Sequence, residues 1–531
     1  MTAIVAELLA GAKRPIGRAD QMLDVAEWAA AAYARFDHRA VDAIVCAAAE
    51  AGHAKAAALA EAAVKETGFG VVAHKTLKNQ MTSRGLYEHY RGQDFCSKRV
   101  RAADKVVELP RPAGVVFALT PSTNPVCTVN FKVLLALMTR NAIVVSPHPL
   151  AKECSAEAAR TMAEAAERAG APAGVVQVID EPNLALVEHV MASPRVQVIL
   201  ATGGAPMVRA AYGSGNPAIG VGPGNAPVLV DATADADAAA RRIVESKSFD
   251  NSVLCTNESV VIAEEAVSDK LAAAMARYGA VMVKDDEVAP LRQALFGAGT
   301  FAVDLLGRSA ATIAQRAGVR VPASAKVLLA PIDRVGLDEP LSREKLCPVL
   351  GFIRVPHARA GISMARALVR MAGAGHSAAI HSRSSETVMA FASALRSLRI
   401  VVNAPCSQGA AGYGTHLAPS FTIGTGFFGR SSVGENIGPE HLINWTRIAY
   451  PDDASEPMGD FAGLEPWTSL GPLAGGREAP MSLGVLQEGA PPRAPKTAHA
   501  APRAAAIDEM AVLREEIRRL VQDELRRALR S

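Results

Sequence analysis

The sequence predicts an α/β protein built around parallel sheets, and three observations support that prediction. Short β-branched runs alternate with helical stretches between residues 105 and 230. The runs are nearly continuously apolar, as expected of strands that are buried on both faces. A second alternating region covers roughly residues 248–445, so the 531-residue chain is expected to contain more than one domain.

The expected elements begin with an alanine-rich segment at residues 20–90, whose apolar side chains recur at three- and four-residue spacing. That spacing predicts two or three helices. The first α/β region should hold a helix at Ser155–Gly170 and strands at Gly114–Leu119, Asn141–Ser146, Val175–Ile179, Val196–Leu200 and Ala226–Val230. The second should hold strands at Ser259–Ile262, Val327–Ala330, Val349–Arg354 and Arg399–Asn403.

The composition changes after Pro451. Residues 452–502 are rich in proline, glycine and alanine, which is typical of a disordered linker. Residues 503–531 carry apolar side chains at helical spacing, with arginine and glutamate between them, which predicts an amphipathic helix. Such a helix needs a partner that covers its apolar side.

Charge and composition exclude several classes of function. The 56 basic and 53 acidic residues give a net charge of +3 without a basic stripe, so we expect no nucleic-acid partner. The first residues lack a basic segment before an apolar core, and no later run is long enough to span a bilayer, so we expect a cytoplasmic protein. The seven cysteines are widely separated and form no C-x-x-C pair, so no metal site is expected.

Cys255 stands at the junction of the two α/β regions, where enzymes of this class place their cleft. A cysteine thiolate attacks aldehydes, and the resulting thiohemiacetal can lose a hydride to a nicotinamide and become a thioester. The alternative is that Cys255 is a buried structural cysteine, which is the more frequent role of a cysteine when nothing is known of its surroundings.

The segment Phe249–Cys255 resembles the nucleophile motif of the acylating aldehyde dehydrogenases, which use coenzyme A. The similarity is strongest to the aldehyde dehydrogenase half of bifunctional aldehyde-alcohol dehydrogenases, and it covers about residues 5–450. Further segments resemble the same family in the same order: Thr120–Pro125, Thr139–Ile143, Ser146–Pro149, Ala201–Gly204, Ala218–Asn225, Glu344–Val349, Asn403–Gly409 and Gly434–Ile443.

The resemblance implies the aldehyde dehydrogenase fold. A Rossmann-like NAD-binding domain would occupy residues 1–247, with a flap strand near 105–112. An α/β catalytic domain would occupy 248–435, and residues 436–451 would return to the cofactor domain and a small oligomerisation flap. Flap strands of this family normally pair between subunits, which implies a homo-oligomer, either a dimer or a tetramer.

The resemblance also implies catalytic roles. Cys255 would be the attacking thiolate, and its backbone N–H, with polar groups near Thr123 and Asn124, would form the oxyanion hole. His376 matches a family histidine that assists coenzyme A chemistry. Its alternative is a structural histidine.

For the cofactor, the resemblance implies contacts from three places. Thr202, Gly203 and Gly204 would contact the dinucleotide, because backbone without side chains can approach a ligand closely. Ser146, Pro147 and His148 would lie at the adenosine ribose, Gly222 would be a further contact, and Glu344 would bind the nicotinamide ribose unless it is a solvated helix charge. No nearby arginine offers a site for a 2′-phosphate, which favours NAD over NADP.

The segment Ile219–Gly224 departs from the hydrolytic members of the family, which carry a water-activating glutamate there. Without that carboxylate, coenzyme A would release the thioester as an acyl-CoA, and the reaction would be reversible. The runner-up is a hydrolytic enzyme that makes a free acid. The aldehyde is expected to be short-chain, with acetaldehyde, propionaldehyde or a polar aldehyde such as sulfoacetaldehyde as candidates.

The proline-rich segment and terminal helix stand where the bifunctional enzymes have their alcohol dehydrogenase half. A linker followed by a short amphipathic helix resembles the encapsulation peptides that recruit enzymes to bacterial microcompartment shells. This implies a shell protein as partner and a place inside a microcompartment. Self-association or docking on its own subunit are the alternatives for the helix, and an assembly scaffold on this fold is the alternative for the whole chain.

Overall fold

The computed structural model describes residues 15–466. Most of the predicted linker at 452–502 and the whole predicted helix at 503–531 lie outside the described residues. The described residues all belong to one compact unit.

The alanine-rich segment forms five helices, where the sequence predicted two or three. They are α2 (Pro15–Tyr33), α3 (His38–Ala54), α4 (Ala56–Thr67), α5 (Val72–Thr82) and α6 (Arg84–Tyr90). The breaks are short and local. Asp37 accepts a hydrogen bond from the Ala40 backbone N–H at 2.8 Å and starts α3, and Gly68 ends α4 in the left-handed conformation. The apolar periodicity of the sequence continues across such breaks. The number of helices in a long apolar-periodic segment is therefore not predictable from the periodicity alone.

A five-stranded parallel sheet follows, in which four of the predicted strands are confirmed. Its spatial order is β5 (Val176–Val178), β4 (Ala142–Ser146), β3 (Val115–Leu119), β6 (Val198–Thr202) and β7 (Ala218–Val221). The connecting helices are α7 (Pro125–Met138), α8 (Lys152–Arg168), α9 (Leu184–Met191) and α10 (Ala205–Gly213). The chain order reverses between β3 and β6, which is the position where open parallel sheets bind ligands.

A second parallel sheet has seven strands. Its spatial order is β10 (Ala280–Met282), β11 (Val327–Pro331), β12 (Val349–Val355), β9 (Glu258–Glu264), β8 (Ala226–Val230), β13 (Ser377–His381) and β14 (Arg399–Val402). Its helices are α11 (Ala236–Ser248), α12 (Glu265–Arg277), α13 (Asp285–Phe296), α14 (Ala310–Ala317), α15 (Ala358–Met371), α16 (Ser385–Ala394) and α17 (Cys406–Gly409).

The strand β8 belongs to a different sheet from the one predicted for it. The sequence grouped it with the cofactor-domain strands that precede residue 247, but it pairs with β9 and β13 in the seven-stranded sheet. Alternation of strands and helices does not mark where one parallel sheet ends and the next begins. The chain passes from the first sheet to the second in residues 222–225, between β7 and β8.

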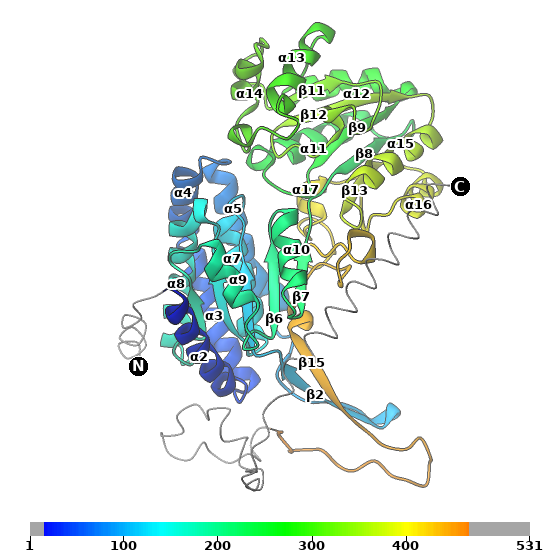
Figure 1. Ribbon diagram of the computed structural model, residues 1–531. Coiled ribbons are helices and arrows are strands. Elements are labelled where there is room, and N and C mark those ends of the chain that lie inside the picture. Colours follow the sequence, from blue (N-terminus) through cyan, green and yellow to red (C-terminus); the bar gives the residue numbers. More distant parts are fainter. Residues whose placement is uncertain (1–14, 467–531) are drawn as a thin grey trace, which may run out of the picture. The chain divides into compact units, whose positions relative to one another are not determined.

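Three strands form a separate antiparallel flap: β1 (Arg99–Arg101), β2 (Val106–Pro112) and β15 (Ile443–Ala449). β2 and β15 pair over their full length, from Val106 opposite Ala449 to Pro112 opposite Ile443. Figure 1 shows these two strands running together, cyan-blue beside orange. Pairing of this flap with another subunit stays a prediction.

Short 3-10 helices complete the elements: η1 (Ala102–Asp104), η2 (Pro149–Ala151), η3 (Phe249–Ser252), η4 (Val303–Leu305), η5 (Pro340–Ser342), η6 (Phe427–Gly429) and η7 (Pro439–Leu442). At the centre of the first sheet's helical layer, every residue of α7 is buried, because α3, α5 and α8 all pack against it.

Within residues 15–466 no single helix is long and apolar enough to cross a membrane. The bent pair α3 and α4 together has the length and composition of a membrane span.

Candidate active site

One cavity of about 600 Å³ collects nearly all the predicted site residues. Its walls include the ends of β3, β4, β6 and β7, the loop before β9 and the segment before β12. Of the twelve predicted residues, eleven line it: Thr123, Asn124, Ser146, Pro147, His148, Thr202, Gly203, Gly204, Gly222, Cys255 and Glu344.

The two parallel sheets meet this cavity with opposite ends. The carboxyl ends of β3, β4, β6 and β7 point into it, so the reversal point of the first sheet lies in its wall. The second sheet contributes its amino ends, because Cys255 lies three residues before β9 and Glu344 five residues before β12. A dinucleotide at the first sheet would therefore face residues carried by the second.

Cys255 is a free, part-exposed thiol in the loop that leads into β9. Burial, and after it the Glu344 carboxylate, raise the pKa of Cys255 to about 12. Its own backbone N–H, Arg399 and Lys78 act in the opposite direction. The thiol is therefore mostly protonated near neutral pH in the protein without ligands.

Glu344 lies close to Cys255 across the backbone of Gly224. The Gly224 N–H donates to Glu344 Oε1 at 3.1 Å, and a Cβ on Gly224 would meet the Cys255 carbonyl oxygen at 1.9 Å. Only glycine allows this approach. Burial raises the pKa of Glu344 to about 7, although the Gly224 N–H and the nearby Lys247 and Lys345 lower it.

Two buried lysines, Lys247 and Lys345, tie the Glu344 segment to the start of β9. Lys247 Nζ donates to the carbonyls of Glu258 at 2.8 Å and Lys345 at 3.1 Å, and Lys345 Nζ donates to the carbonyl of Ser259 at 3.1 Å. Burial lowers the pKa of Lys345 to about 7 and that of Lys247 to about 8. These bonds fix the start of β9, which follows the Cys255 loop, against the segment that carries Glu344.

The loop before Cys255 is held in an unusual conformation. Asp250, Asn251 and Ser252 have φ angles of 51°, 51° and 67°, a region that costs a residue other than glycine about 1–3 kcal/mol. Specific hydrogen bonds offset that cost: Asn251 Nδ2 donates to the Gly307 carbonyl at 2.9 Å, and Asn257 Nδ2 donates to Ser252 Oγ at 2.7 Å. The structure therefore determines the path of the chain into Cys255 tightly.

The structure does not bring His376 into the cavity. Its side chain is fully buried, Nδ1 lies 2.6 Å from Ser377 Oγ, and Nε2 finds no hydrogen-bond partner among the described residues. Burial and the adjacent Arg399 lower the pKa of His376 to about 3, so the imidazole is neutral. The predicted role in coenzyme A chemistry thus has no support in this geometry.

Comparison with known proteins identifies the family. The model of the "Aldehyde dehydrogenase family" matches residues 11–293. A succinate-semialdehyde dehydrogenase (acetylating) of Clostridium kluyveri is 36% identical over 78% of this chain and 92% of its own length. The chain belongs to the aldehyde dehydrogenase family.

Other aldehyde dehydrogenases extend the comparison. An aldehyde-alcohol dehydrogenase of Clostridium acetobutylicum is 38% identical over 81% of this chain, but the match spans only 50% of that protein. A solved acetylating aldehyde dehydrogenase from Geobacillus thermoglucosidasius has a TM-score of 0.81 at 36% identity, covering 84% of this chain and 98% of that one. A propionaldehyde dehydrogenase from a Clostridium phytofermentans fucose utilisation bacterial microcompartment has a TM-score of 0.74 at 27% identity, covering 82% and 98%. The predicted aldehyde dehydrogenase fold and the resemblance to acylating members are confirmed.

The residues at the first sheet suit the dinucleotide that aldehyde dehydrogenases use. Gly204 is the N-cap of α10 and the helix has no side-chain cap, so the N–H groups of Ala205 and Met207 could donate to an anion in the cavity, whereas Pro206 has none. Thr202 Oγ1 lies 3.3 Å from Thr422 Oγ1, which joins this turn to the far side of the cavity. A phosphate-bearing cofactor would find backbone donors here.

Sequence reasoning missed several residues of this aldehyde dehydrogenase site. Lys75 and Lys78 of α5 contact Asp250 and the Thr123–Asn124 turn, although they are far from both in sequence. The sequence feature that could have pointed to them is the spacing of the two lysines, three residues apart on one helix. Such a pair is usually found on the solvent-exposed face of a helix. Only the fold reveals that both are buried.

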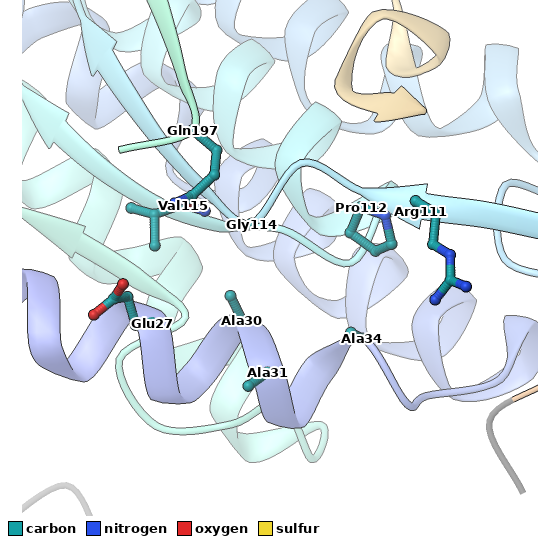
Figure 2. Close-up of a pocket in the computed structure, with 9 residues that line it drawn as sticks. All are labelled: Glu27, Ala30, Ala31, Ala34, Arg111, Pro112, Gly114, Val115 and Gln197. Carbon is teal, nitrogen blue, oxygen red and sulfur yellow. Dashed lines mark hydrogen bonds between the residues drawn. The ribbon is translucent and has the colours of Figure 1, made fainter. Parts of the chain in front are cut away.

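A second cavity, of about 350 Å³, lies between α2 and the start of β3 (Figure 2). Ala30, Ala31 and Ala34 form its helical wall, and Gln197 accepts a hydrogen bond from the Val115 N–H at 2.7 Å on the other side. None of the predicted site residues lines it. The 600 Å³ cavity is therefore the candidate active site.

Proposed function

We propose that this chain oxidises a short-chain aldehyde to its acyl-CoA, with NAD as hydride acceptor and coenzyme A as acyl acceptor. The observation that carries the proposal is the position of Cys255 in the same cavity as the carboxyl ends of β3, β4 and β6. The proposal is also supported by relatives whose names describe acetylating dehydrogenases. Because the chain spans half of the first relative's length, the activity of the whole protein remains our proposal.

Cys255 Sγ would lose its proton to water and, as a thiolate, form a bond to the aldehyde carbon. N–H donors at Cys255 and Asn124 would stabilise the negative charge that develops on the aldehyde oxygen. Bound NAD would accept the hydride that the same carbon releases, and Cys255 would then carry the acyl group as a thioester. Thr202, Gly203 and Gly204 would hold the dinucleotide, together with Ser146, Pro147, His148 and Gly222.

Coenzyme A would complete the reaction. Its thiolate would attack the thioester carbon, and Cys255 would leave as a thiolate. Of the described residues that line the cavity, Glu344 alone carries a carboxylate, and it accepts a hydrogen bond from Gly224. The segment 219–224 carries no carboxylate for water activation, so water should attack the thioester slowly.

Glu344 also favours a second candidate, hydrolysis to a free acid. With its pKa raised to about 7, part of the Glu344 population is ionised at neutral pH and could accept a proton from water. Its predicted role at the nicotinamide ribose and this role as a base exclude each other at any one moment. Dependence of turnover on coenzyme A distinguishes the two functions.

The preference for NAD over NADP rests on charge near the predicted adenosine ribose. Lys152, which follows Ser146–His148, bonds both carboxylate oxygens of Glu181 at 2.7 and 2.8 Å. Its charge is thus already compensated. A 2′-phosphate in that region would meet the Glu181 carboxylate as well as the lysine, which disfavours NADP.

Assembly and location follow from the same family. We propose that the protein is a homo-oligomer, with the flap of β1, β2 and β15 at the subunit contact. We also propose that it works in the cytoplasm inside a bacterial microcompartment, recruited to a shell protein by residues 503–531. The microcompartment source of one similar structure supports this location.

The test is NADH formation from a panel of short aldehydes, with and without coenzyme A, for the wild type, Cys255→Ala and Cys46→Ala. Cys46 is the matched control, because it is a part-buried cysteine of α3 and does not line the cavity. We expect turnover that requires both coenzyme A and Cys255 and is unaffected at Cys46. Turnover without coenzyme A would support hydrolysis instead, and turnover by Cys255→Ala would refute the assigned nucleophile.

A further inference from the structure

Lys75, Lys78 and Asp250 form a cluster of three buried charges beneath the candidate active site. Asp250 is fully buried, and the side chains of Lys75 and Lys78 are 4% and 2% exposed. Lys78 Nζ donates to Asp250 Oδ2, and Lys75 Nζ donates to the same oxygen at 3.1 Å. The lysines belong to α5, whereas Asp250 lies five residues before Cys255.

Backbone contacts fix Asp250 from the other side. The Val71 N–H donates to Asp250 Oδ1 at 2.7 Å, and the Asp250 N–H donates to His74 Nδ1 at 2.9 Å. Burial acts to raise the pKa of Asp250, but Lys78, Lys75 and the hydrogen bond from the Val71 N–H outweigh it and hold the pKa below its ordinary value. Asp250 is therefore a carboxylate, and the nucleophile loop is anchored to α5.

Both lysines also reach the turn that carries the proposed oxyanion donors. Lys75 Nζ donates to the Thr123 carbonyl at 3.0 Å, and Lys78 Nζ donates to Asn124 Oδ1. Asn124 Nδ2 in turn donates to the Val253 carbonyl at 3.0 Å, two residues before Cys255. The cluster thus joins the turn after β3 to the loop before β9.

The contact with Lys78 decides which way the Asn124 amide faces. An ammonium group has donors and no acceptor, so it can bind only the oxygen end of the amide. The nitrogen end then faces Val253, whose carbonyl accepts one of its two N–H groups, and Asn124 is one of the residues that line the cavity. The space beside the cluster, lined by Lys75, Lys78 and Asn124, measures about 10 Å³, room for no more than one water.

We propose that Lys78, held by Asp250, is a positioning residue that fixes the Asn124 amide so that its free N–H points at the aldehyde oxygen. This inference rests on the proposed function, because it assumes that an oxygen anion develops in this cavity. Lys78 does not touch the substrate. It acts through Asn124, and Lys75 holds the neighbouring Thr123 carbonyl in the same way.

The test is a double-mutant cycle on kcat for NADH formation with saturating coenzyme A, using Asn124→Ala, Lys78→Met and the double variant. Loss of one oxyanion donor lowers kcat by about 10²- to 10³-fold, so we expect Asn124→Ala to fall in that range. Lys78→Met should lower kcat at least about tenfold with little change in KM for the aldehyde. The double variant should be no slower than Asn124→Ala, because Lys78 acts only through that amide.

Two further variants separate positioning from general loss of structure. Lys78→Gln keeps an N–H donor for Asn124 Oδ1, so it should recover part of the activity that Lys78→Met loses, and it replaces Lys78→Met in the cycle if that variant does not fold. Lys65→Met, an exposed lysine of the adjacent α4, is the control and should match the wild type.

The proposal is overturned if Lys78→Met retains wild-type kcat, or if the losses of the two single variants multiply in the double variant. A multiplied loss would mean that Lys78 acts independently of Asn124. These outcomes differ from failure of the proposed function, in which Cys255→Ala would remain active or turnover would not require coenzyme A.

Discussion

Cys255 combines a reactive position with surroundings that oppose its ionisation. Its thiol is part-exposed in the candidate active site, yet burial and Glu344 raise its pKa to about 12. Only the thiolate attacks electrophiles. In the free protein the fraction of Cys255 that is thiolate should therefore be small near neutral pH and should rise with pH. Removing the negative charge of Glu344 should also increase that fraction.

We predict that alkylation of Cys255 by iodoacetamide accelerates about tenfold for each pH unit between 7 and 9, because the pH stays well below the thiol pKa throughout. Glu344→Gln should accelerate alkylation at pH 8.5 by about two- to tenfold, since it removes a negative charge that raises the Cys255 pKa. Mass spectrometry of the Cys255 peptide in a Cys46→Ala background measures both rates.

Glu386→Gln, an exposed carboxylate at the start of α16, serves as the control for that measurement and should leave the rate unchanged. A rate that levels off below pH 8 would show that the free thiol has a much lower pKa. Slower alkylation in Glu344→Gln would show that the carboxylate assists the thiol rather than opposing its ionisation.

At the scale of elements, the link between β7 and β8 contacts both the backbone of Cys255 and the side chain of Glu344. Gly224 lies in this link, with the Cys255 carbonyl against its Cα and its N–H on Glu344. A methyl group at this position would sit 1.9 Å from the Cys255 carbonyl oxygen, so the nucleophile loop or the link must move. Movements of about 1 Å in a reacting group can cost about 10²-fold in rate.

Gly224→Ala should therefore lower kcat by about 10²-fold while the protein still folds. Gly213→Ala is the matched control, because a Cβ there, at the end of α10, meets nothing within 4 Å. The measurements are kcat for NADH formation and the thermal midpoint of each variant. Normal kcat in Gly224→Ala would mean that the loop before β9 can shift without disturbing Cys255.

Nine of the twelve strands in the two parallel sheets were predicted from sequence, whereas β7, β10 and β13 were not, and the assignment of strands to sheets was not predictable. Val115–Leu119 and Ala142–Ser146 are buried along their length and read as apolar runs, which is the signal the sequence offers. Ala226–Val230 has the same apolar pattern and the same full burial, yet it belongs to the other sheet. Sheet membership depends on pairing between distant segments, which a local pattern does not contain.

The same limit applies to the candidate site. Cys255, Glu344 and the Thr202–Gly204 turn were found because their motifs are local, and the fold brings them to one cavity. Asp250 lies 172 residues from Lys78, so no spacing rule links the two. His376 was named from its motif, but it is buried and is not among the residues that line the cavity.

At the scale of the whole molecule, the chain divides into a described enzyme-like unit and a tail. The compact unit ends at Pro472, and the residues that line the candidate active site all lie between Leu119 and Ile423. Composition gives residues 452–502 the character of a linker. A linker of the kind that this composition predicts would let the two parts of the chain act separately.

A variant that ends at Pro472 should therefore keep the kcat, the KM for aldehyde and coenzyme A, and the thermal midpoint of the full chain. Residues 473–531 fused to a fluorescent protein should be sufficient for co-localisation with microcompartment shells, because the predicted amphipathic helix can bury its apolar side only on a partner. The truncated enzyme, labelled in the same way, should stay outside the shells. A lower kcat or thermal midpoint in the truncated enzyme would instead place the tail on its own catalytic unit, and a diffuse fusion protein would remove the shell as its partner.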